Sequence, residues 1–140
     1  MNLAIRYYTK TGNTKKLAEA AAETLGVPAL PVSVPLKEPA DILFLGSSVY
    51  AGYVDQAVEQ FIASLDKSQV KKVVNFSTAA VLSSTYGSMK KLLTAKGIPL
   101  DSREFHCRGK FFFLHRSHPN QADLSRMKAF VKNVVSSDEK

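Results

Sequence analysis

The sequence predicts an α/β fold in which a parallel β-sheet is covered by helices on both faces. Apolar runs of strand length alternate with amphipathic runs of helix length along all 140 residues. The run Asp41–Gly46 is apolar almost throughout, as in central parallel strands that are buried on both faces. Units that alternate in this way build a parallel sheet through crossover helices. We expect one domain over residues 1–140, because this length and a hydrophobic content of 45% suffice for one core.

The first half of the chain begins with a strand, a helix and a second strand. Leu3–Tyr8 is short, apolar and aromatic, as expected of a buried strand. Good helix formers fill the next stretch, which predicts a helix from about Asn13 to Leu25 that ends at Gly26. Pro28–Pro35 contains the β-branched residues of a strand, but its prolines cannot donate ladder hydrogen bonds. We therefore expect an edge strand there.

The second half repeats the alternation after the central run. Three stretches with apolar residues at helical spacing are separated by two strand-like runs. The last strand contains Gly109, which indicates a bend or bulge, and the polar tail from Ser136 is expected to fray. The predicted elements are helices over 54–65, around Tyr86, Met89 and Leu93, and after Pro119, with strands over Lys71–Phe76 and Ser102–Leu114.

The turn between the first strand and the first helix is dense in hydroxyl groups. Threonines surround Gly12, a residue that allows close backbone approach or a positive φ. The start of the following helix adds N–H groups and the positive end of the helix dipole. Together these groups favour the binding of a phosphate or carboxylate. The turn is neither a Gly-x-x-x-x-Gly-Lys-[Ser/Thr] triphosphate loop nor a Gly-x-Gly-x-x-Gly dinucleotide turn.

This turn resembles the loop that holds the FMN phosphate in flavodoxins, whose pattern Thr-x-Thr-Gly-Asn-Thr it matches. The resemblance implies a flavodoxin-like three-layer sandwich with a five-stranded parallel sheet of order 2-1-3-4-5. It also implies FMN as the cofactor, since one hydroxyl-lined turn suits one terminal monophosphate. The residues implied to hold the phosphate are Thr9, Lys10, Thr11, Gly12, Asn13 and Thr14.

Two later loops resemble the flavodoxin segments that hold the flavin ring. Gly46–Tyr50 matches a Gly-x-Ser-x-aromatic segment whose aromatic side chain stacks on the ring; the other interpretation of Tyr50 is an exposed or core-capping tyrosine. Ser77–Ala80 resembles the loop whose backbone binds the pyrimidine edge, although it lacks the acidic residue and second aromatic of many flavodoxins. Tyr86 either reaches the flavin or packs within its own helix. The residues implied to contact the ring are Ser48, Val49, Tyr50, Ala51, Gly52, Ser77, Thr78, Ala79 and Ala80.

The resemblance implies a protein that carries electrons through FMN, without a side chain that acts as catalytic acid or base. The alternative is an FMN-dependent oxidoreductase, either a quinone reductase or a protoporphyrinogen-oxidase-like protein, that acts on an organic substrate. The apolar, open loop at Ser77–Ala80 favours the enzyme, whereas the absence of long insertions favours the carrier. One cysteine, Cys107, and three scattered histidines support neither a metal site nor a Ser-His-Asp or Cys-His arrangement.

Charge distinguishes this sequence from electron-carrying flavodoxins, which are typically acidic. Its formal net charge is +7, and Lys10, Lys15 and Lys16 lie around the predicted turn. We therefore expect a redox partner protein that is acidic at its docking surface. The other basic residues form scattered pairs without an aromatic platform, which argues against a nucleic-acid surface. With no apolar run near the roughly 20 residues of a membrane span and no cleavage-type leader, we expect no span and a cytoplasmic location.

Overall fold

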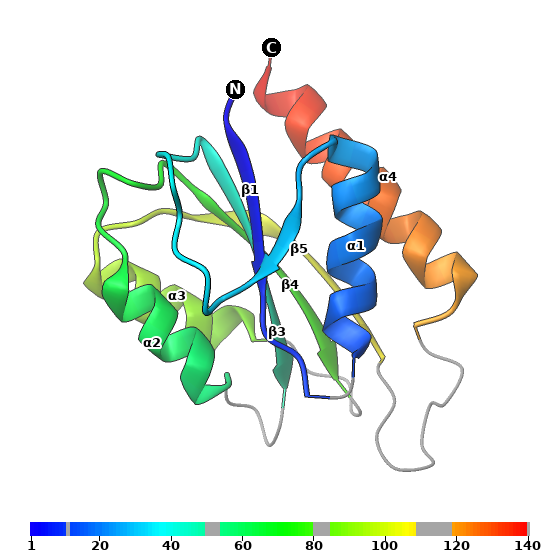
Figure 1. Ribbon diagram of the computed structural model, residues 1–140, viewed down its shortest axis with the longest axis horizontal. Coiled ribbons are helices and arrows are strands. Elements are labelled where there is room, and N and C mark those ends of the chain that lie inside the picture. Colours follow the sequence, from blue (N-terminus) through cyan, green and yellow to red (C-terminus); the bar gives the residue numbers. More distant parts are fainter. Residues whose placement is uncertain (11, 50–53, 80–84, 109–118, 140) are drawn as a thin grey trace.

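The computed structural model describes residues 1–10, 12–49, 54–79, 85–108 and 119–139. Its strands form one parallel sheet in the order β2-β1-β3-β4-β5, which confirms the predicted order (Figure 1). Among the described helices, none is long and apolar enough to cross a membrane. The elements are β1 (Leu3–Tyr7), α1 (Asn13–Leu25), β2 (Ala29–Pro31), β3 (Ile42–Val49), α2 (Gln56–Ser64), β4 (Val73–Ala79), α3 (Tyr86–Ala95), β5 (Leu100–Arg108) and α4 (Gln121–Asp138).

Helices α1 and α4 cover one face of the sheet, and α2 and α3 cover the other (Figure 1). Successive side chains of a strand point to opposite faces, so each strand contributes to two cores. In β3, Phe44 belongs to the core under α1 and α4, whereas Leu43 and Leu45 belong to the core under α2 and α3. Both faces of this central strand are therefore apolar, which explains why its sequence shows no polar alternation.

Strands β3 and β4 are longer than their apolar runs predict. Each continues for three residues past its predicted end, from 46 to 49 in β3 and from 76 to 79 in β4. In this extension Ser47 pairs with Ser77, and Ser48 pairs with Thr78. All four residues are buried. The sheet therefore continues beyond its apolar part into a buried polar region at its carboxyl end.

The predicted edge strand is present as β2, but it covers only Ala29–Pro31. The connection from β2 to β3, residues 32–41, contains no helix, unlike the other three crossovers. The Arg6 side chain holds this connection on the sheet, because its Nε donates to the Val34 carbonyl oxygen at 2.8 Å and its Nη2 to that of Pro35 at 3.0 Å. Arg6 is only 5% exposed, and burial lowers the pKa of its guanidinium.

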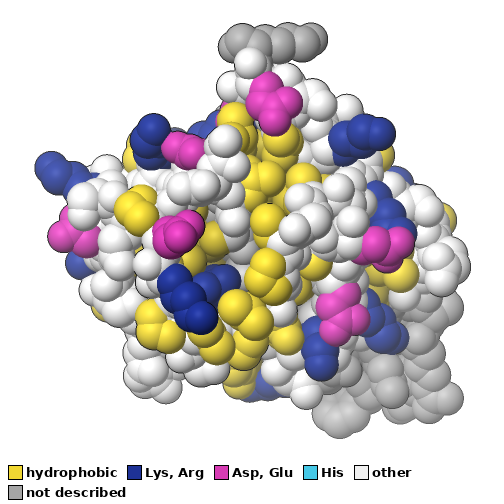
Figure 2. All heavy atoms as spheres, turned by 45° about the horizontal axis from the view of Figure 1, so that its top comes forward, with side chains coloured by type: hydrophobic (Ala, Val, Ile, Leu, Met, Phe, Trp, Pro, Cys, Tyr) yellow, Lys and Arg dark blue, Asp and Glu magenta, His cyan; other side chains and the backbone are white. Residues whose placement is uncertain are grey.

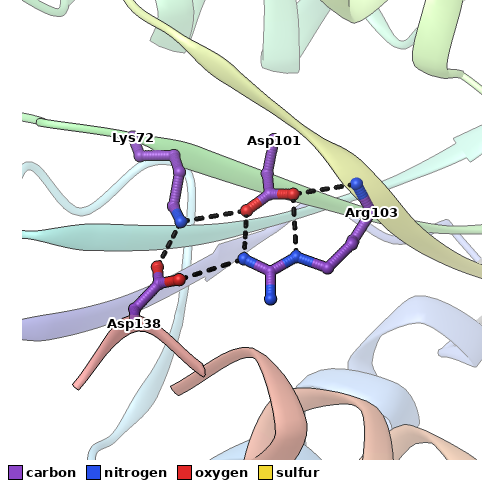
Figure 3. Close-up of polar contacts among 4 residues, drawn as sticks. All are labelled: Lys72, Asp101, Arg103 and Asp138. Atoms are coloured by element: carbon purple, nitrogen blue, oxygen red, sulfur yellow. Dashed lines mark hydrogen bonds and ion pairs between the residues drawn. The ribbon is translucent and has the colours of Figure 1, made fainter. Parts of the chain in front are cut away.

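Four charged side chains join the end of α4 to the starts of β4 and β5 (Figure 3). Asp101 Oδ2 lies 2.9 Å from Lys72 Nζ and 2.6 Å from Arg103 Nη2. One carboxylate oxygen of Asp138 accepts a hydrogen bond from Lys72. The other lies 3.1 Å from Arg103 Nη2. The expected fraying from Ser136 is therefore wrong: α4 continues to Asp138, whose carboxylate is held at both oxygens.

The irregularity of β5 lies near its start. The register between β4 and β5 changes from Val73 opposite Leu100 to Asn75 opposite Glu104, so β5 contains extra residues between these pairs. Asp101 and Arg103 of the charged cluster lie in this irregular segment. The bend predicted at Gly109, and the part of the predicted strand beyond it, lie outside the described residues.

Charged side chains of both signs are interspersed on the face shown in Figure 2, on either side of a band of apolar side chains. Exposed ion pairs among the described residues include Lys71 with Asp41, at 3.0 Å, and Lys128 with Glu23, at 3.3 Å. On this face the basic side chains are therefore spread among acidic ones and do not form one patch.

Candidate cofactor site

The turn from β1 into α1 leaves the start of the helix without a side-chain cap. Gly12 is the N-cap residue and has a φ of 90°, in the left-handed region that favours glycine. The first turn of α1 contains no acidic residue. In α4, by contrast, Asn120 and Asp123 form a capping box with hydrogen bonds of 2.8 and 2.9 Å. The start of α1, unlike that of α4, is therefore arranged to receive an external anion.

Thr9 shapes this turn from its inner side. The Gly12 amide donates to Thr9 Oγ1 at 2.9 Å, and the Lys16 amide donates to the Gly12 carbonyl oxygen at 3.1 Å as the helix begins. Thr9 is half-buried, whereas Lys10, Lys15 and Lys16 are exposed around the turn. The turn is thus fixed by its own hydroxyl and surrounded by positive charge.

Three of the predicted residues meet in a buried hydroxyl cluster. Thr14 Oγ1 lies 3.0 Å from Ser48 Oγ and 3.0 Å from Thr78 Oγ1. It also donates to the Ser47 carbonyl oxygen at 3.4 Å. Thr14 is fully buried, so its hydroxyl joins the first turn of α1 to the ends of β3 and β4. We assign the Thr14 side chain this positioning role, which the sequence pattern alone did not reveal.

A second buried network lies on the opposite face of the same strands. Ser47 Oγ donates to Thr85 Oγ1 at 3.0 Å, and Asn75 Nδ2 donates to the same oxygen at 3.0 Å. These contacts tie Thr85, the residue before α3, to β3 and β4. Sequence reasoning did not single out Asn75 and Thr85. One feature of the sequence could have indicated this network: Asn75 is a polar amide within the otherwise apolar start of β4.

Two further polar groups lie at this end of the sheet, Ser77 Oγ fully buried and the Asp55 carboxylate half-buried. Ser77 Oγ is buried and has no hydrogen-bond partner among the described residues. Leaving such a group unsatisfied costs roughly 1–3 kcal/mol. Asp55 Oδ2 lies 3.4 Å from the Ser48 amide, and burial raises the pKa of the Asp55 carboxyl. Unsatisfied or perturbed groups of this kind are found more often at ligand sites than elsewhere.

Gly46 allows the helix start and the two strands to approach each other. A Cβ atom at this position would lie 2.3 Å from Phe76 Cε2 and 2.9 Å from Thr14 Cγ2, closer than real Cβ contacts allow. The absence of a side chain at Gly46 therefore permits the packing that places Thr14 in the hydroxyl cluster.

The structure brings ten of the predicted residues to the carboxyl end of the sheet and leaves others undescribed. Val49 and Ala79 are placed as the last residues of β3 and β4. Tyr86 is the half-buried first residue of α3, whose Met89 is fully buried. The ten residues are Thr9, Lys10, Gly12, Asn13, Thr14, Ser48, Val49, Ser77, Thr78 and Ala79. The predicted residues that lie outside the described part of the chain are Thr11, Tyr50, Ala51, Gly52 and Ala80.

Comparison with known proteins gives one family match and one related sequence. A family model described as "Flavodoxin domain" matches residues 4–112. An uncharacterized protein of Methanocaldococcus jannaschii is 28% identical over 137 residues, which cover 88% of this chain and 90% of that protein.

Solved structures share the fold. A flavodoxin from the domain Archaea aligns with a TM-score of 0.78 and 18% identity over 100% of both chains. A flavoprotein of Lactobacillus acidophilus, solved in complex with FMN, aligns with a TM-score of 0.59 and 15% identity over 76% of this chain and 92% of that chain. At these identities, the likeness concerns the arrangement of helices and strands.

Proposed function

The chain belongs to the flavodoxin domain family, and from this premise we propose that it binds FMN at the carboxyl ends of β1, β3 and β4. The observation that carries the proposal is the start of α1. There a left-handed Gly12, the Thr9 hydroxyl and the exposed Lys10 surround a helix start with neither a side-chain cap nor an acid in its first turn. A phosphate would supply the missing negative charge and acceptor oxygens. The Lactobacillus flavoprotein, which shares the fold, was solved with FMN and supports the choice of cofactor.

The residues at this end of the sheet fit such a cofactor. The turn of Thr9 and Gly12 would hold the phosphate, and Lys10 adds positive charge beside it. Ser48 and Thr78, near the ends of β3 and β4, lie where the ring would follow the phosphate. When bound, FMN supplies the electron transfer. The chain binds and orients it, and the two buried polar networks keep the ends of β3 and β4 in place.

We propose that this protein carries electrons between partners rather than converting an organic substrate. The archaeal flavodoxin covers the whole of this chain and is itself wholly covered by it, which supports this proposal. The exposed Lys10, Lys15 and Lys16 lie beside the proposed site. Their charge favours a partner that is acidic where it docks.

The first test compares FMN with riboflavin, which has the same ring but no phosphate. The FMN-free protein should bind FMN more tightly than riboflavin in a fluorescence titration. Thr9→Val removes the acceptor of the Gly12 amide, so it should weaken FMN binding by roughly 1–3 kcal/mol and riboflavin binding much less. Thr94→Val, an exposed position in α3, is the matched control and should change neither affinity. Equal affinities for FMN and riboflavin in the unmodified protein would contradict the proposed phosphate site.

A second test separates the carrier from the enzyme. The FMN-loaded protein is mixed with NAD(P)H and a panel of quinones, without any reductase. The carrier should show negligible steady-state turnover, yet accept electrons in an anaerobic reductive titration. Sustained turnover by the protein alone would replace the carrier with an FMN-dependent oxidoreductase and leave the FMN proposal intact.

A further inference from the structure

A cavity of about 640 Å³ lies at the carboxyl ends of β1 and β2, beside the turn that begins α1. Its walls come from three places: the residues that follow β1, the helix-free connection after β2, and one side of α2. Binding sites for small organic molecules have volumes of roughly 300–1,000 Å³. The cavity is therefore large enough for a ligand of its own.

The walls are mainly apolar. The lining residues include the aromatic Tyr8 and Phe61 and the proline Pro35. Phe61 is 6% exposed and is anchored in the core under α2 and α3, against which Tyr8 also packs. Gln60 and Ser64 line the cavity from the same helix at successive turns and are exposed. This combination of rings with a few polar groups is typical of sites for planar organic molecules.

The wall formed by the helix-free connection is fixed before any ligand binds. The Val32 amide donates to the Tyr7 carbonyl oxygen at 2.9 Å, and the Val34 amide donates to the Pro31 carbonyl oxygen at 3.0 Å. The buried Arg6 guanidinium binds the next two carbonyl oxygens of the connection, those of Val34 and Pro35. A ligand therefore does not have to order this segment, which lowers the entropic cost of binding.

Charge indicates the kind of ligand. Lys15 lines the cavity, whereas no acidic residue does so among the described residues. Lys15 Nζ is 3.9 Å from Glu19 Oε1, and both side chains are more than half exposed, so this pair is weak and leaves Lys15 available. Thr9 lines the same cavity. The polar end of the cavity therefore favours an anionic group.

We propose that this cavity is a second ligand site, separate from the cofactor site, for a planar apolar molecule that carries a carboxylate, sulfonate or similar anion. The anion lies toward Lys15 and Thr9, and the planar body lies between Tyr8, Pro35 and Phe61. Its lining includes no residue of β3 or β4, but it does include Thr9 and the end of β1, which also belong to the proposed cofactor site. The two sites share only this part of the chain, and the second site does not depend on FMN binding.

The test uses naphthalene-2-sulfonate as the anionic probe and 2-naphthol as its neutral counterpart at pH 7. Calorimetric titrations are made on the full chain, both FMN-free and with FMN in saturating excess. We expect one sulfonate per chain in both states, with affinity roughly threefold to fivefold above that of the naphthol. Lys15→Gln should remove this difference, and Lys16→Gln, the neighbouring exposed lysine that does not line the cavity, should retain it.

A blocking variant tests the location of the probe. Gln60→Trp places a large side chain in the cavity and should abolish binding, whereas Gln56→Trp, one turn earlier on α2 and outside the lining, should bind as the unmodified chain does. Ser64→Trp provides a second blocking variant if Gln60→Trp is poorly folded. Unchanged binding in both blocking variants would overturn the proposal, and so would complete displacement of the probe by FMN. A chain that fails to bind FMN but binds the probe would refute the cofactor proposal and support this one.

Discussion

Gly46 shows how one residue without a side chain sets the geometry of the cofactor site. In Gly46→Ala the new Cβ would meet the Phe76 ring and the Thr14 methyl group at distances that require a shift of both. Because Phe76 and Thr14 are fully buried, we expect the free energy of unfolding to fall by roughly 1–3 kcal/mol. Urea unfolding measures this change. FMN affinity should fall as well, since Thr14 positions the start of α1.

The matched control is Gly87→Ala in α3, where the new Cβ would meet nothing within 4 Å. Alanine is the better helix former, so the free energy of unfolding should stay the same or rise by up to about 1 kcal/mol. If both alanine variants unfold at the same urea concentration, the prediction that Gly46 is needed for close packing is wrong.

Pro31 lies in the edge strand β2, as its proline character predicted. The Val32 amide donates to Tyr7 of β1, so the alternation of a strand turns the backbone nitrogen of residue 31 away from β1. A proline at this position removes no ladder hydrogen bond, and it blunts an edge that could otherwise pair with another chain. Prolines in a strand-like run therefore indicated the edge of the sheet.

At the scale of elements, the charged cluster of Lys72, Asp101, Arg103 and Asp138 fastens the end of α4 to the sheet. The Asp101 side chain is only 7% exposed and is held by Arg103 and Lys72. Asp101→Asn removes the charge that both cations face, so we expect the free energy of unfolding to fall by roughly 2 kcal/mol near pH 7. Glu23→Gln, which breaks an exposed pair with Lys128, is the control and should cost less than about 1 kcal/mol.

The contribution of Asp101 should depend on pH in a defined direction. Hydrogen bonds from Arg103, followed by those from Lys72, hold the pKa of the Asp101 carboxyl well below its usual value of 3.8. A lowered pKa in the folded state means that the stabilisation is complete above the unfolded pKa and is lost as pH falls through the folded one. The difference between the native chain and Asp101→Asn should therefore be constant from about pH 5 to 8 and shrink below about pH 4. A difference that grew in acid would contradict this assignment.

At the scale of the whole molecule, the sequence predicted the alternation of elements and, through the family resemblance, the strand order. It failed where tertiary contacts decide the outcome. Ser47 and Thr78 are polar and resembled loop residues, yet they continue β3 and β4 because buried hydroxyl networks receive their side chains. Asp138 lies in a polar tail that pattern alone marks as frayed, but distant charges fasten it. Nothing in the sequence around Arg6 predicted that its side chain would bind residues 32–41, the connection that has no crossover helix.

The net charge of the molecule leads to a kinetic prediction that depends on the proposed function. The FMN-loaded, reduced protein should be oxidised by ferricyanide, an anion, at a rate that falls severalfold between about 0.01 and 0.3 M salt. Oxidation by hexaamminecobalt(III), a cation, should not fall in this way. Stopped-flow absorbance measures both rates.

Variants locate the charge responsible for this effect. Lys16→Gln, beside the turn, should weaken the salt dependence with ferricyanide, whereas Lys91→Gln on α3 should change it little. Identical salt dependence for the two oxidants would show that positive charge near the turn does not guide electron exchange.

The fastening of α4 also determines how the molecule can be attached to a surface. Asp138 is held beside the starts of β4 and β5, and the N-terminus lies at the same end of the molecule as the end of α4 (Figure 1). The turn around Gly12 lies at the other end. A protein film tethered to an electrode through its C-terminus would thus expose the proposed cofactor end to the solution. Direct electron transfer between the cofactor and the electrode would require attachment near Lys10 instead.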